Sequence, residues 1–159
     1  MISRRLLLAL AAIPAVALAQ PAEPTSAQPA LAKEPLDVVT RDGVRHEFQV
    51  EMALTPEQQR VGEMFRKSVP PDGGMLFDWG RPRESQMWMK NTLVPLDMVF
   101  INQDGTIRSI AESTVPRSLA TVDSRGPVRA TLELAGGVTA KLNITVGDKV
   151  AGGPFGKAP

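Results

Sequence analysis

The sequence has no cysteine and only one histidine, His46, and each absence narrows the chemistry open to it. Without thiols there is no thiol nucleophile, thiolate metal site or redox pair, so the core alone must hold the fold. A Ser-His-Asp triad is not expected, because His46 falls on the inward face of a predicted strand near its edge. Phosphate-binding loops and zinc-ligand spacings are missing as well. We therefore expect no metal and no cofactor.

A hydrophobic run long enough to span a membrane is also missing, since about 20 apolar residues are needed. The run from Leu6 to Leu18 is shorter, follows Arg4 and Arg5, and leads into Ala17-Leu18-Ala19, a small-x-small cleavage pattern. These features predict a signal peptide over residues 1–19 and a periplasmic or secreted protein with no membrane span after cleavage. An ordinary export signal and a twin-arginine signal both fit, and an uncleaved anchor is the alternative.

The sequence lacks an excess of charge of either sign, with 18 Lys and Arg against 17 Asp and Glu. Removal of Arg4 and Arg5 with the signal peptide leaves 16 basic residues and a net charge of −1. A chain so balanced has no electrostatic footprint for DNA or RNA. We expect no nucleic-acid partner.

Composition divides the rest of the chain into three parts. Residues 20–35 carry four prolines among Ala, Gln, Ser and Glu without apolar periodicity, which predicts a disordered linker. Residues 36–151 have the size of one ordinary domain. Residues 152–159, rich in glycine, are predicted to be a flexible tail.

Within the domain, short strand patterns dominate. Arg41-Asp42-Gly43 predicts a hairpin turn, and the following segment to Ala53 alternates as a half-buried strand does. Thr55-Pro56-Glu57-Gln58 predicts a capped helix start. Residues 80–84 read as a charged loop between a strand at 74–79 and strands at 85–90 and 94–101. With further strands near 106–115, 128–134 and 146–150, we predict a mainly β fold: a compact antiparallel sandwich or partly open barrel with one or two short helices.

Polar residues are concentrated in one otherwise apolar run, Gln86 to Ile101. Trp88 and Lys90 are predicted to share a strand face, where an exposed indole could stack on a sugar or aromatic ring; an indole that anchors the sheet is the alternative. We predict a ligand-binding surface around this run. Its candidate residues are Trp88, Lys90, Asn91 and Asp97, with Arg81, Arg83 and Glu133 as neighbours.

Asp97 stands out because aspartate is depleted from strand interiors and a buried carboxylate is costly unless it is paired. Its predicted partners are Lys90, Asn91 and the backbone amides of the bend between the two strands. A structural clamp on that bend is the main interpretation, and a functional carboxylate is the other. Glu133, between two leucines, raises the same question. Paired carboxylates for glycoside cleavage are available among Asp78, Asp97, Glu112 and Glu133.

Several methionine side chains are also predicted to lie close together. Met87 and Met89 alternate on one predicted strand face, and Met64, Met75 and Met98 could join them. Thioethers select Cu(I), although methionine is also a common filler of irregular cores. Core packing is the main interpretation and a copper site the alternative.

The sequence resembles the bacterial and archaeal family known as domain of unknown function 192 over nearly all of residues 36–150. The matching residues are Arg60, Met64-Phe65-Arg66, Gly74-Met75-Leu76-Phe77, Met87 to Thr92, Pro95 to Phe100, Leu132-Glu133 and Gly147-Asp148. The resemblance implies a compact, mainly β, often exported domain with no assigned activity.

Two positions depart from the family pattern. Glu63 occupies a position at which members of that family commonly have leucine; if that position is buried in them, Glu63 is expected to turn outward here. Arg117-Ser118 stands where many members have a cysteine, so any role of that thiol is absent.

Taken together, these patterns predict an exported, tethered domain that binds a small molecule, an envelope polymer or a protein rather than catalysing a reaction. A carboxylate-dependent envelope hydrolase and a methionine-based copper-binding protein are the alternatives.

Overall fold

The structure, a computed structural model, describes residues 22–157. The predicted signal peptide lies outside the described residues, as do positions 20, 21, 158 and 159 of the predicted linker and tail. Among the residues described, no helix is long and apolar enough to cross a membrane.

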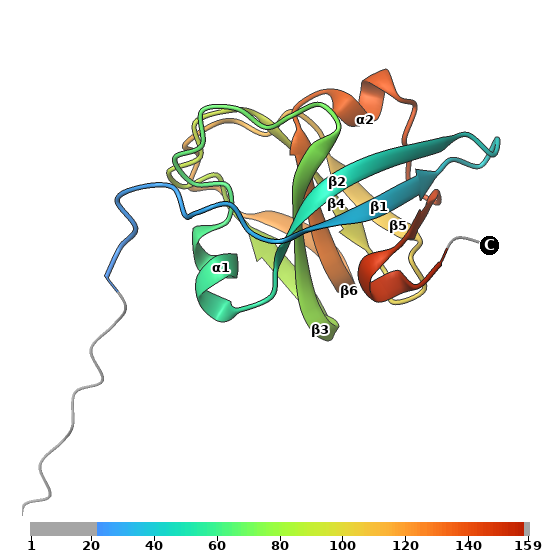
Figure 1. Cartoon of the computed structure of the whole chain (residues 1–159), viewed down its shortest axis with the longest axis horizontal. Helices are drawn as coiled ribbons and strands as arrows, with labels where there is room; N and C mark the ends of the chain where they lie inside the picture. The colour runs from blue at the N-terminus through green and yellow to red at the C-terminus, as the bar shows by residue number, and fades with distance from the viewer. Residues whose placement is uncertain (1–21, 158–159) are drawn as a thin grey trace, which may run out of the picture.

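Seven strands form one mixed sheet that curls into a half-barrel, with two short α-helices and a 3-10 turn beside it (Figure 1). The elements are β1 (Lys33–Val39), β2 (Arg45–Ala53), α1 (Pro56–Val61), β3 (Gly73–Met87), β4 (Leu96–Ile101), β5 (Ile107–Ala111), β6 (Val122–Ala135), α2 (Val138–Lys141), β7 (Lys149–Ala151) and η1 (Gly153–Phe155). The strand order is β5-β4-β6-β3-β2-β1-β7. The predicted mainly β class with a partly open barrel and short helices is confirmed.

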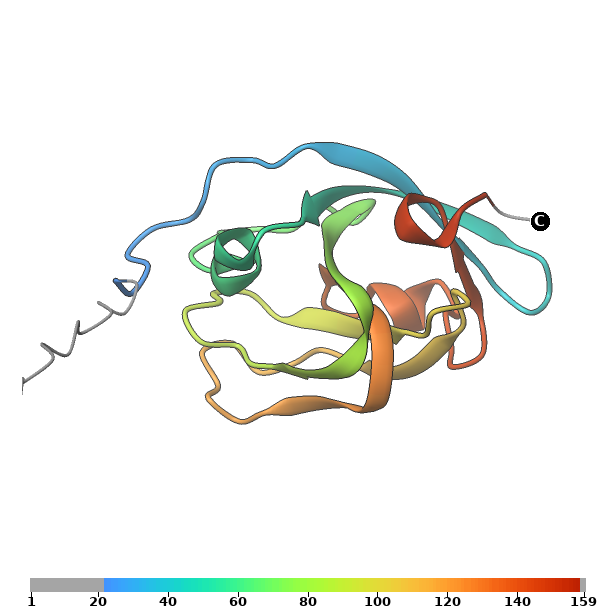
Figure 2. The same cartoon turned by 90° about the horizontal axis from the view of Figure 1, so that it is seen from below.

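The two edges of the sheet meet at one point. Thr106, just before β5, bridges to Lys149 in β7, and Val150 N–H donates to the carbonyl of Gly105 over 2.8 Å. Figure 2 shows the strands curling around a shared interior, which holds the main core between them. The contact between the edges is short, so the barrel stays partly open.

One strand pair departs from the predicted antiparallel arrangement. β2 and β3 run parallel, because α1 carries the chain back across the sheet between them. The helix starts as predicted: Thr55 Oγ1 accepts from Gln58 N–H over 3.2 Å, and Gln58 Oε1 accepts from Thr55 N–H over 3.0 Å. It ends at Gly62, whose φ of 49° leads the chain into a tight turn over the sheet.

The predicted loop at residues 80–84 is wrong, since β3 continues through it to Met87. The register between β3 and β6 shifts between Asp78 and Arg83, so the strand bulges and bends there without ending. Residues 81–84 are exposed on both faces, which removes the alternation that would have revealed a strand. The predicted strand at 85–90 correspondingly stops at Met87, and residues 88–95 form a loop.

The N-terminal segment is held against the body of the domain. β1 begins at Lys33, inside the segment predicted as a linker. Further upstream, Gln28 Nε2 donates to the carbonyls of Gln58 and Gly62 at the end of α1, over 3.1 and 3.0 Å. In the same way η1 occupies part of the predicted tail, and Phe155 packs on the core.

Candidate functional site

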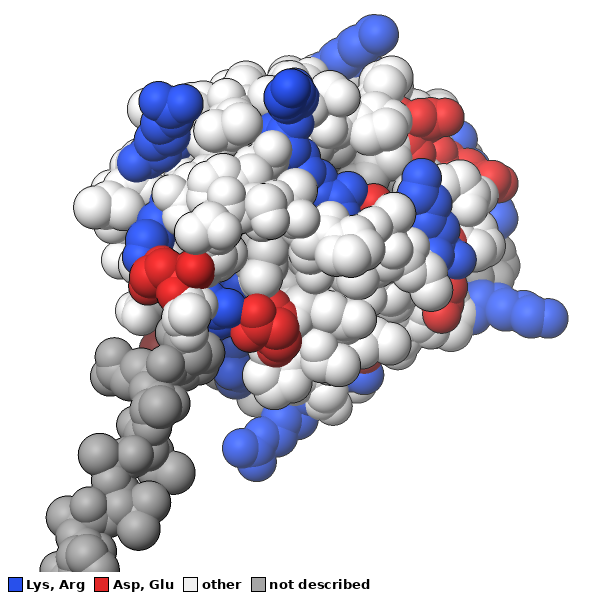
Figure 3. Space-filling model, turned by 60° about the vertical axis from the view of Figure 1, so that its left-hand side comes forward, with Lys and Arg blue, Asp and Glu red and all other residues white. Residues whose placement is uncertain are grey.

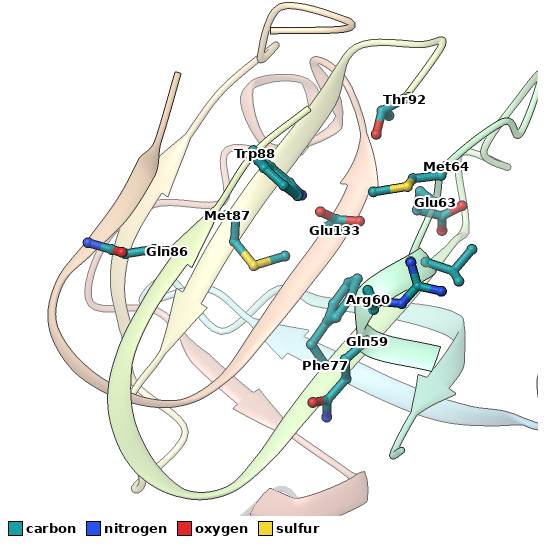
Figure 4. Close-up of a pocket in the computed structure, with 12 residues that line it drawn as sticks. Gln59, Arg60, Glu63, Met64, Phe77, Gln86, Met87, Trp88, Thr92 and Glu133 are labelled. Carbon is teal, nitrogen blue, oxygen red and sulfur yellow. The ribbon is translucent and has the colours of Figure 1, made fainter. Parts of the chain in front are cut away.

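A pocket of about 240 Å³ lies between the C-terminal end of α1, the last residues of β3 and the inner face of β6. Figure 4 shows Glu133 at its centre, with Trp88 and Met87 on one side and Met64 and Glu63 on the other. The residues that line it are Gln59, Arg60, Val61, Gly62, Glu63, Met64, Phe77, Gln86, Met87, Trp88, Thr92 and Glu133.

Glu133 is positioned by the sheet itself. It lies directly opposite Met75 of β3 on one side and Met98 of β4 on the other, so the three side chains share one face. Gly74 lets the strands pack this closely, because a Cβ there would lie 2.3 Å from the carbonyl oxygen of Glu133. The glutamate is therefore fixed by backbone pairing on both flanks.

The carboxyl group of Glu133 is buried among apolar side chains without a hydrogen-bond partner. The residue is 4 % exposed, and among residues 22–157 its carboxyl makes no hydrogen bond, although its oxygens reach the open space of the pocket. Burial raises its pKa well above the usual value, and the charge of Glu63 adds to the rise. Burial therefore favours the neutral acid over the carboxylate at this position.

Glu63 is the second buried acid of the pocket, and the expectation that it turns outward is wrong. Gly62 turns the chain inward, so that Glu63 is 4 % exposed. Its Oε2 lies 3.1 Å from Arg66 Nε without forming a hydrogen bond. Burial raises the pKa of Glu63 to about 7, the charge of Arg66 opposes the rise, and Glu51 adds to it.

Arg66 is already engaged by another carboxylate. Its two terminal nitrogens donate to the two oxygens of Glu51 over 2.6 and 2.8 Å, and Leu31 N–H donates to Glu51 as well. Glu51 lies opposite Met75 on the same face as Glu133. One guanidinium thus serves two buried carboxyl groups, and Glu133 has none.

Trp88 stands at the rim of the pocket, 48 % exposed, at the start of the loop after β3. Lys90 Nζ lies 5.1 Å from the centre of its ring and also pairs with Glu23 over 2.7 Å. Asn91, with φ of 56°, accepts at its carbonyl from Phe65 N–H over 2.8 Å. That bond ties the Trp88 loop to the turn that carries Glu63.

The structure thus brings together some of the predicted site residues and separates others. Trp88 and Glu133 line the pocket, and Lys90 and Asn91 lie in the adjoining loop. Arg81 is exposed on the bulge of β3 and Asp97 is buried elsewhere; neither lines the pocket. Arg83 lies over the ring of Trp79, 4.1 Å from its centre, also outside the pocket.

Asp97 binds partners other than those predicted. Fully buried, it accepts from the backbone N–H groups of Ser113, Gly137 and Thr139 over 2.7, 2.9 and 2.9 Å, and from the Thr139 hydroxyl over 2.7 Å. Neither Lys90 nor the bend beside it is among them. In the structure Asp97 clamps β4 to the chain after β5 and to the start of α2.

Sequence reasoning missed Glu63 as a member of the site. Its position just after the predicted helix gave no reason to place it inside, and only the resemblance marked it as unusual. The other acids considered for catalysis do not join it: Asp78 pairs with Arg129, and Glu112 is exposed. Within the described residues, no three His, Asp or Glu side chains form a metal-binding group.

The methionines divide between pocket and core. Met64 and Met87 line the pocket, whereas Met75, Met89 and Met98 are fully buried in apolar clusters. The Sδ of Met89 accepts from the Thr114 hydroxyl over 3.1 Å. The core-packing interpretation describes these last three.

The pocket opens on a surface without a strong charge. Figure 3 shows the end of the molecule where α1 and the loops lie: basic and acidic groups are scattered and separated by uncharged surface. No continuous patch of one sign covers this face. The pocket can therefore offer two aromatic rings, two acids, two thioethers and the side chain of Arg60, with no extended field around them.

Known families and structures match nearly the whole domain. The family DUF192, described as "Uncharacterized ACR", matches residues 37–152. A crystal structure from Sinorhizobium meliloti 1021, named only as a candidate transcription regulator, is 47 % identical with a TM-score of 0.75 and covers 77 % of this chain and 95 % of its own. A protein of unknown function from Novosphingobium aromaticivorans is 37 % identical, with a TM-score of 0.74 and coverage of 79 % and 90 %. No curated protein matches.

Proposed function

The chain belongs to the DUF192 family, and we propose that it is a binding module that takes a small polar ligand, or the end of an envelope polymer, into the pocket above Glu133. The observation that carries this proposal is the buried carboxyl of Glu133, which faces the pocket without a partner among the described residues. Its oxygens are not fully enclosed, so they reach the open space of the pocket and are accessible to a ligand. A ligand that supplies the missing hydrogen bond explains why the protein keeps this carboxyl group.

Trp88 gives the ligand its second contact. The indole is half-exposed at the rim and lies next to Met87, so a flat or apolar part of the ligand can stack there while its polar end reaches Glu133. The cavity, with a few polar groups among apolar walls, has the composition of small-molecule sites. Lys90 and Asn91 support the rim in this proposal.

The proposal places this activity outside the cytoplasm. The support is the predicted signal peptide over residues 1–19 and the proline-rich segment that follows it. The ligand is then a small molecule, polymer or protein of the periplasm or the surroundings of the cell. A signal-peptide deletion that leaves the protein in the cytoplasm, compared with the intact gene by cell fractionation, tests the location.

The binding proposal is tested by native mass spectrometry of the protein isolated from the compartment in which it accumulates, before dialysis. We expect a bound mass on the natural protein and its loss in Trp88→Ala, whose side chain is exposed enough to leave the fold intact. Leu119→Ala, which removes another exposed apolar side chain, is the matched control and should keep the mass. A bare natural protein contradicts tight binding of a small ligand.

Hydrolysis is the second candidate, because two acids with raised pKa values line one pocket. Glycoside cleavage uses one protonated acid and one carboxylate. Burial would keep Glu133 protonated as the acid, and Glu63, with a pKa of about 7, would be the base. Release of sugars from envelope glycans by the natural protein, lost in both Glu133→Gln and Glu63→Gln, would support it.

A copper site is supported only by the presence of Met64 and Met87 in the pocket wall. Two thioethers without a histidine are a weak ligand set. The same mass spectra test it, since a bound mass matching copper would favour the methionines over Glu133. Met87→Leu would then abolish that mass, whereas Met89→Leu in the core would not.

A further inference from the structure

Buried carboxyl groups outnumber buried cations at the inner end of the pocket. Glu63 and Glu133 line the pocket, and Glu51 and Arg66 lie outside it, on the other side of Glu63. Arg66 is the one cation among these buried side chains, and Arg60, a partly exposed cation of the pocket lining, is paired with Glu57. The guanidinium of Arg66 is held by Glu51 through two hydrogen bonds. Glu133 and the free oxygen of Glu63 are therefore left to face a ligand.

The polar side chains that α1 contributes to the pocket wall have their donors in use. Gln59 Nε2 donates to the carbonyls of Ala53 and Asp78 over 3.0 and 2.8 Å. Arg60 is bound through two nitrogens by Glu57, over 2.9 and 2.6 Å. What remains free consists of carboxyl oxygens, thioethers, aromatic faces and the indole N–H of Trp88, which makes no hydrogen bond among the described residues. A ligand that satisfies the carboxyl oxygens must bring donors for them.

The apolar walls also suit a cation. Trp88 already holds one ammonium group, Lys90 Nζ, 5.1 Å from its ring centre. Met64 and Met87 present polarisable sulfurs, and Phe77 adds a second ring. The cavity of about 240 Å³ has room for a short chain that ends in an ammonium group.

We propose that the ligand of this pocket carries a primary ammonium group on a short apolar chain. The ammonium donates to the carboxylates of Glu133 and Glu63, and the chain packs between Met64, Met87 and the ring of Trp88. This inference rests on the binding function proposed above and names its chemical class. The three N–H donors of the ammonium can bond to the free carboxyl oxygens of the two acids. Its positive charge balances the carboxylate of Glu133, which has no counter-charge of its own.

Binding is coupled to a proton. Burial and the charge of Glu63 favour the protonated form of Glu133, so an ammonium that pairs with its carboxylate displaces that proton into the solvent. The charged groups that face it are Glu63 and Arg60 at the end of α1, Arg66 with its partner Glu51, and Lys90 at the rim. None of these cations pairs with Glu133, and Glu63, with a pKa of about 7, contributes to the proton release at neutral pH as well.

The test uses three probes of equal size: 1-butylammonium, 1-butanol and butyrate. Each is titrated calorimetrically into the purified protein, in buffers of different ionisation enthalpy, and the indole N–H signals of Trp79 and Trp88 are followed by NMR. We expect only butylammonium to bind and to shift the Trp88 signal. Its binding should release protons, and its affinity should rise with pH through the range in which Glu63 and Glu133 lose their protons.

Variants locate the binding site. Glu133→Gln keeps the shape of the side chain and should lower the butylammonium affinity at least tenfold and reduce the proton release. Trp88→Ala, at the exposed rim, should weaken binding without affecting folding and so covers the case in which Glu133→Gln does not fold. Glu112→Gln, an exposed acid away from the pocket, should bind as the natural protein does.

The outcomes distinguish a failure of the ammonium proposal from a failure of the binding function on which it rests. Binding of butanol or butyrate with a shift of the Trp88 signal overturns the ammonium class and leaves the binding function in place. Butylammonium binding that is indifferent to Glu133→Gln and releases no proton overturns Glu133 as the anchor. Failure of all three probes, together with a bare protein in native mass spectrometry, overturns both.

Discussion

Glu63 Oε2 lies 3.1 Å from Arg66 Nε inside the domain, yet the two atoms form no hydrogen bond, because the guanidinium is turned toward Glu51. Glu63 therefore lies close to the positive charge of Arg66 but receives no hydrogen bond from it. Burial outweighs that charge and holds the pKa of Glu63 at about 7. The residue is poised to change its charge near neutral pH.

This pKa predicts how Glu63→Gln changes stability with pH. A carboxyl with a folded pKa of about 7 and an unfolded value of 4.5 binds its proton more tightly in the native state. Its contribution is fully present below pH 4.5 and is lost as the pH rises to 7. Glutamine stays neutral throughout. We expect the variant to gain on the natural protein by about 3 kcal/mol between pH 4.5 and 8.

Urea unfolding of both proteins at pH 4.5, 6 and 8 measures this gain. Only the difference between the two proteins is interpreted, because other carboxylates titrate in both. Glu112→Gln, which removes an exposed acid, should show no such trend. A difference between Glu63→Gln and the natural protein that stays constant with pH contradicts the assigned pKa.

Removal of the shared cation should be more severe. Arg66→Met leaves Glu51 and Glu63 buried without a counter-charge, and breaking such a buried pair costs about 3–5 kcal/mol. The loss should be smaller at pH 4.5 than at pH 8, because the abandoned carboxyls can then take up protons. Urea unfolding at the two pH values measures it.

A surface pair of the same kind is the control for Arg66→Met. Arg45 contacts Asp37 over 2.9 Å, but its side chain is 53 % exposed. Arg45→Met should therefore cost less than about 1 kcal/mol. Equal losses in the two variants would show that burial of the Arg66 group contributes nothing.

The elements that could be predicted are those whose signal lies in neighbouring residues of the chain. Alternation gave β2, and the Thr55 capping box gave α1, because both signals depend on neighbours in the chain. The continuous β3 could not be found, because its exposed bulge carries polar residues on both faces. The parallel pairing of β2 with β3 depends on how α1 crosses the sheet, which the pattern of residues does not record.

The site was only half predictable for a related reason. Trp88 and Glu133 are unusual where they stand, an exposed indole and an acid between leucines, and both line the pocket. Asp97 is equally unusual, yet it serves three backbone amides that are distant in sequence. Glu63 looked like an ordinary residue after a helix; only the φ of 49° at Gly62 turns it inward. Tertiary contacts decide between such cases.

The floor of the pocket depends on Gly74. A methyl group there would lie 2.3 Å from the carbonyl oxygen of Glu133, a backbone atom that cannot move aside without separating β3 from β6. We expect Gly74→Ala to lower the free energy of unfolding by about 3 kcal/mol or more. Thermal unfolding followed by circular dichroism measures the loss.

The neighbouring glycine provides the control for Gly74→Ala. A methyl group on Gly73 would meet only the side chain of Pro70, at 3.2 Å, so Gly73→Ala should change stability by less than about 1 kcal/mol. If both alanine variants melt at the same temperature, close approach of the strands is not what Gly74 provides.

A substitution at Asp97 tests whether this carboxylate is structural or functional. Asp97→Asn keeps the shape but replaces an acceptor oxygen by an NH₂ group that faces backbone donors, with four hydrogen bonds at stake. Because hydrogen bonds to a charged group contribute about 1.5–3 kcal/mol each, a loss of about 3 kcal/mol or more is expected in urea unfolding. Binding at the Trp88 pocket, measured below the melting temperature of the variant, should be unchanged, since Asp97 does not line it. Lost binding in a folded Asp97→Asn would mean that the clamp beside α2 reaches the pocket through β4, where Met98 follows Asp97 in the chain and lies beside Glu133 in the sheet.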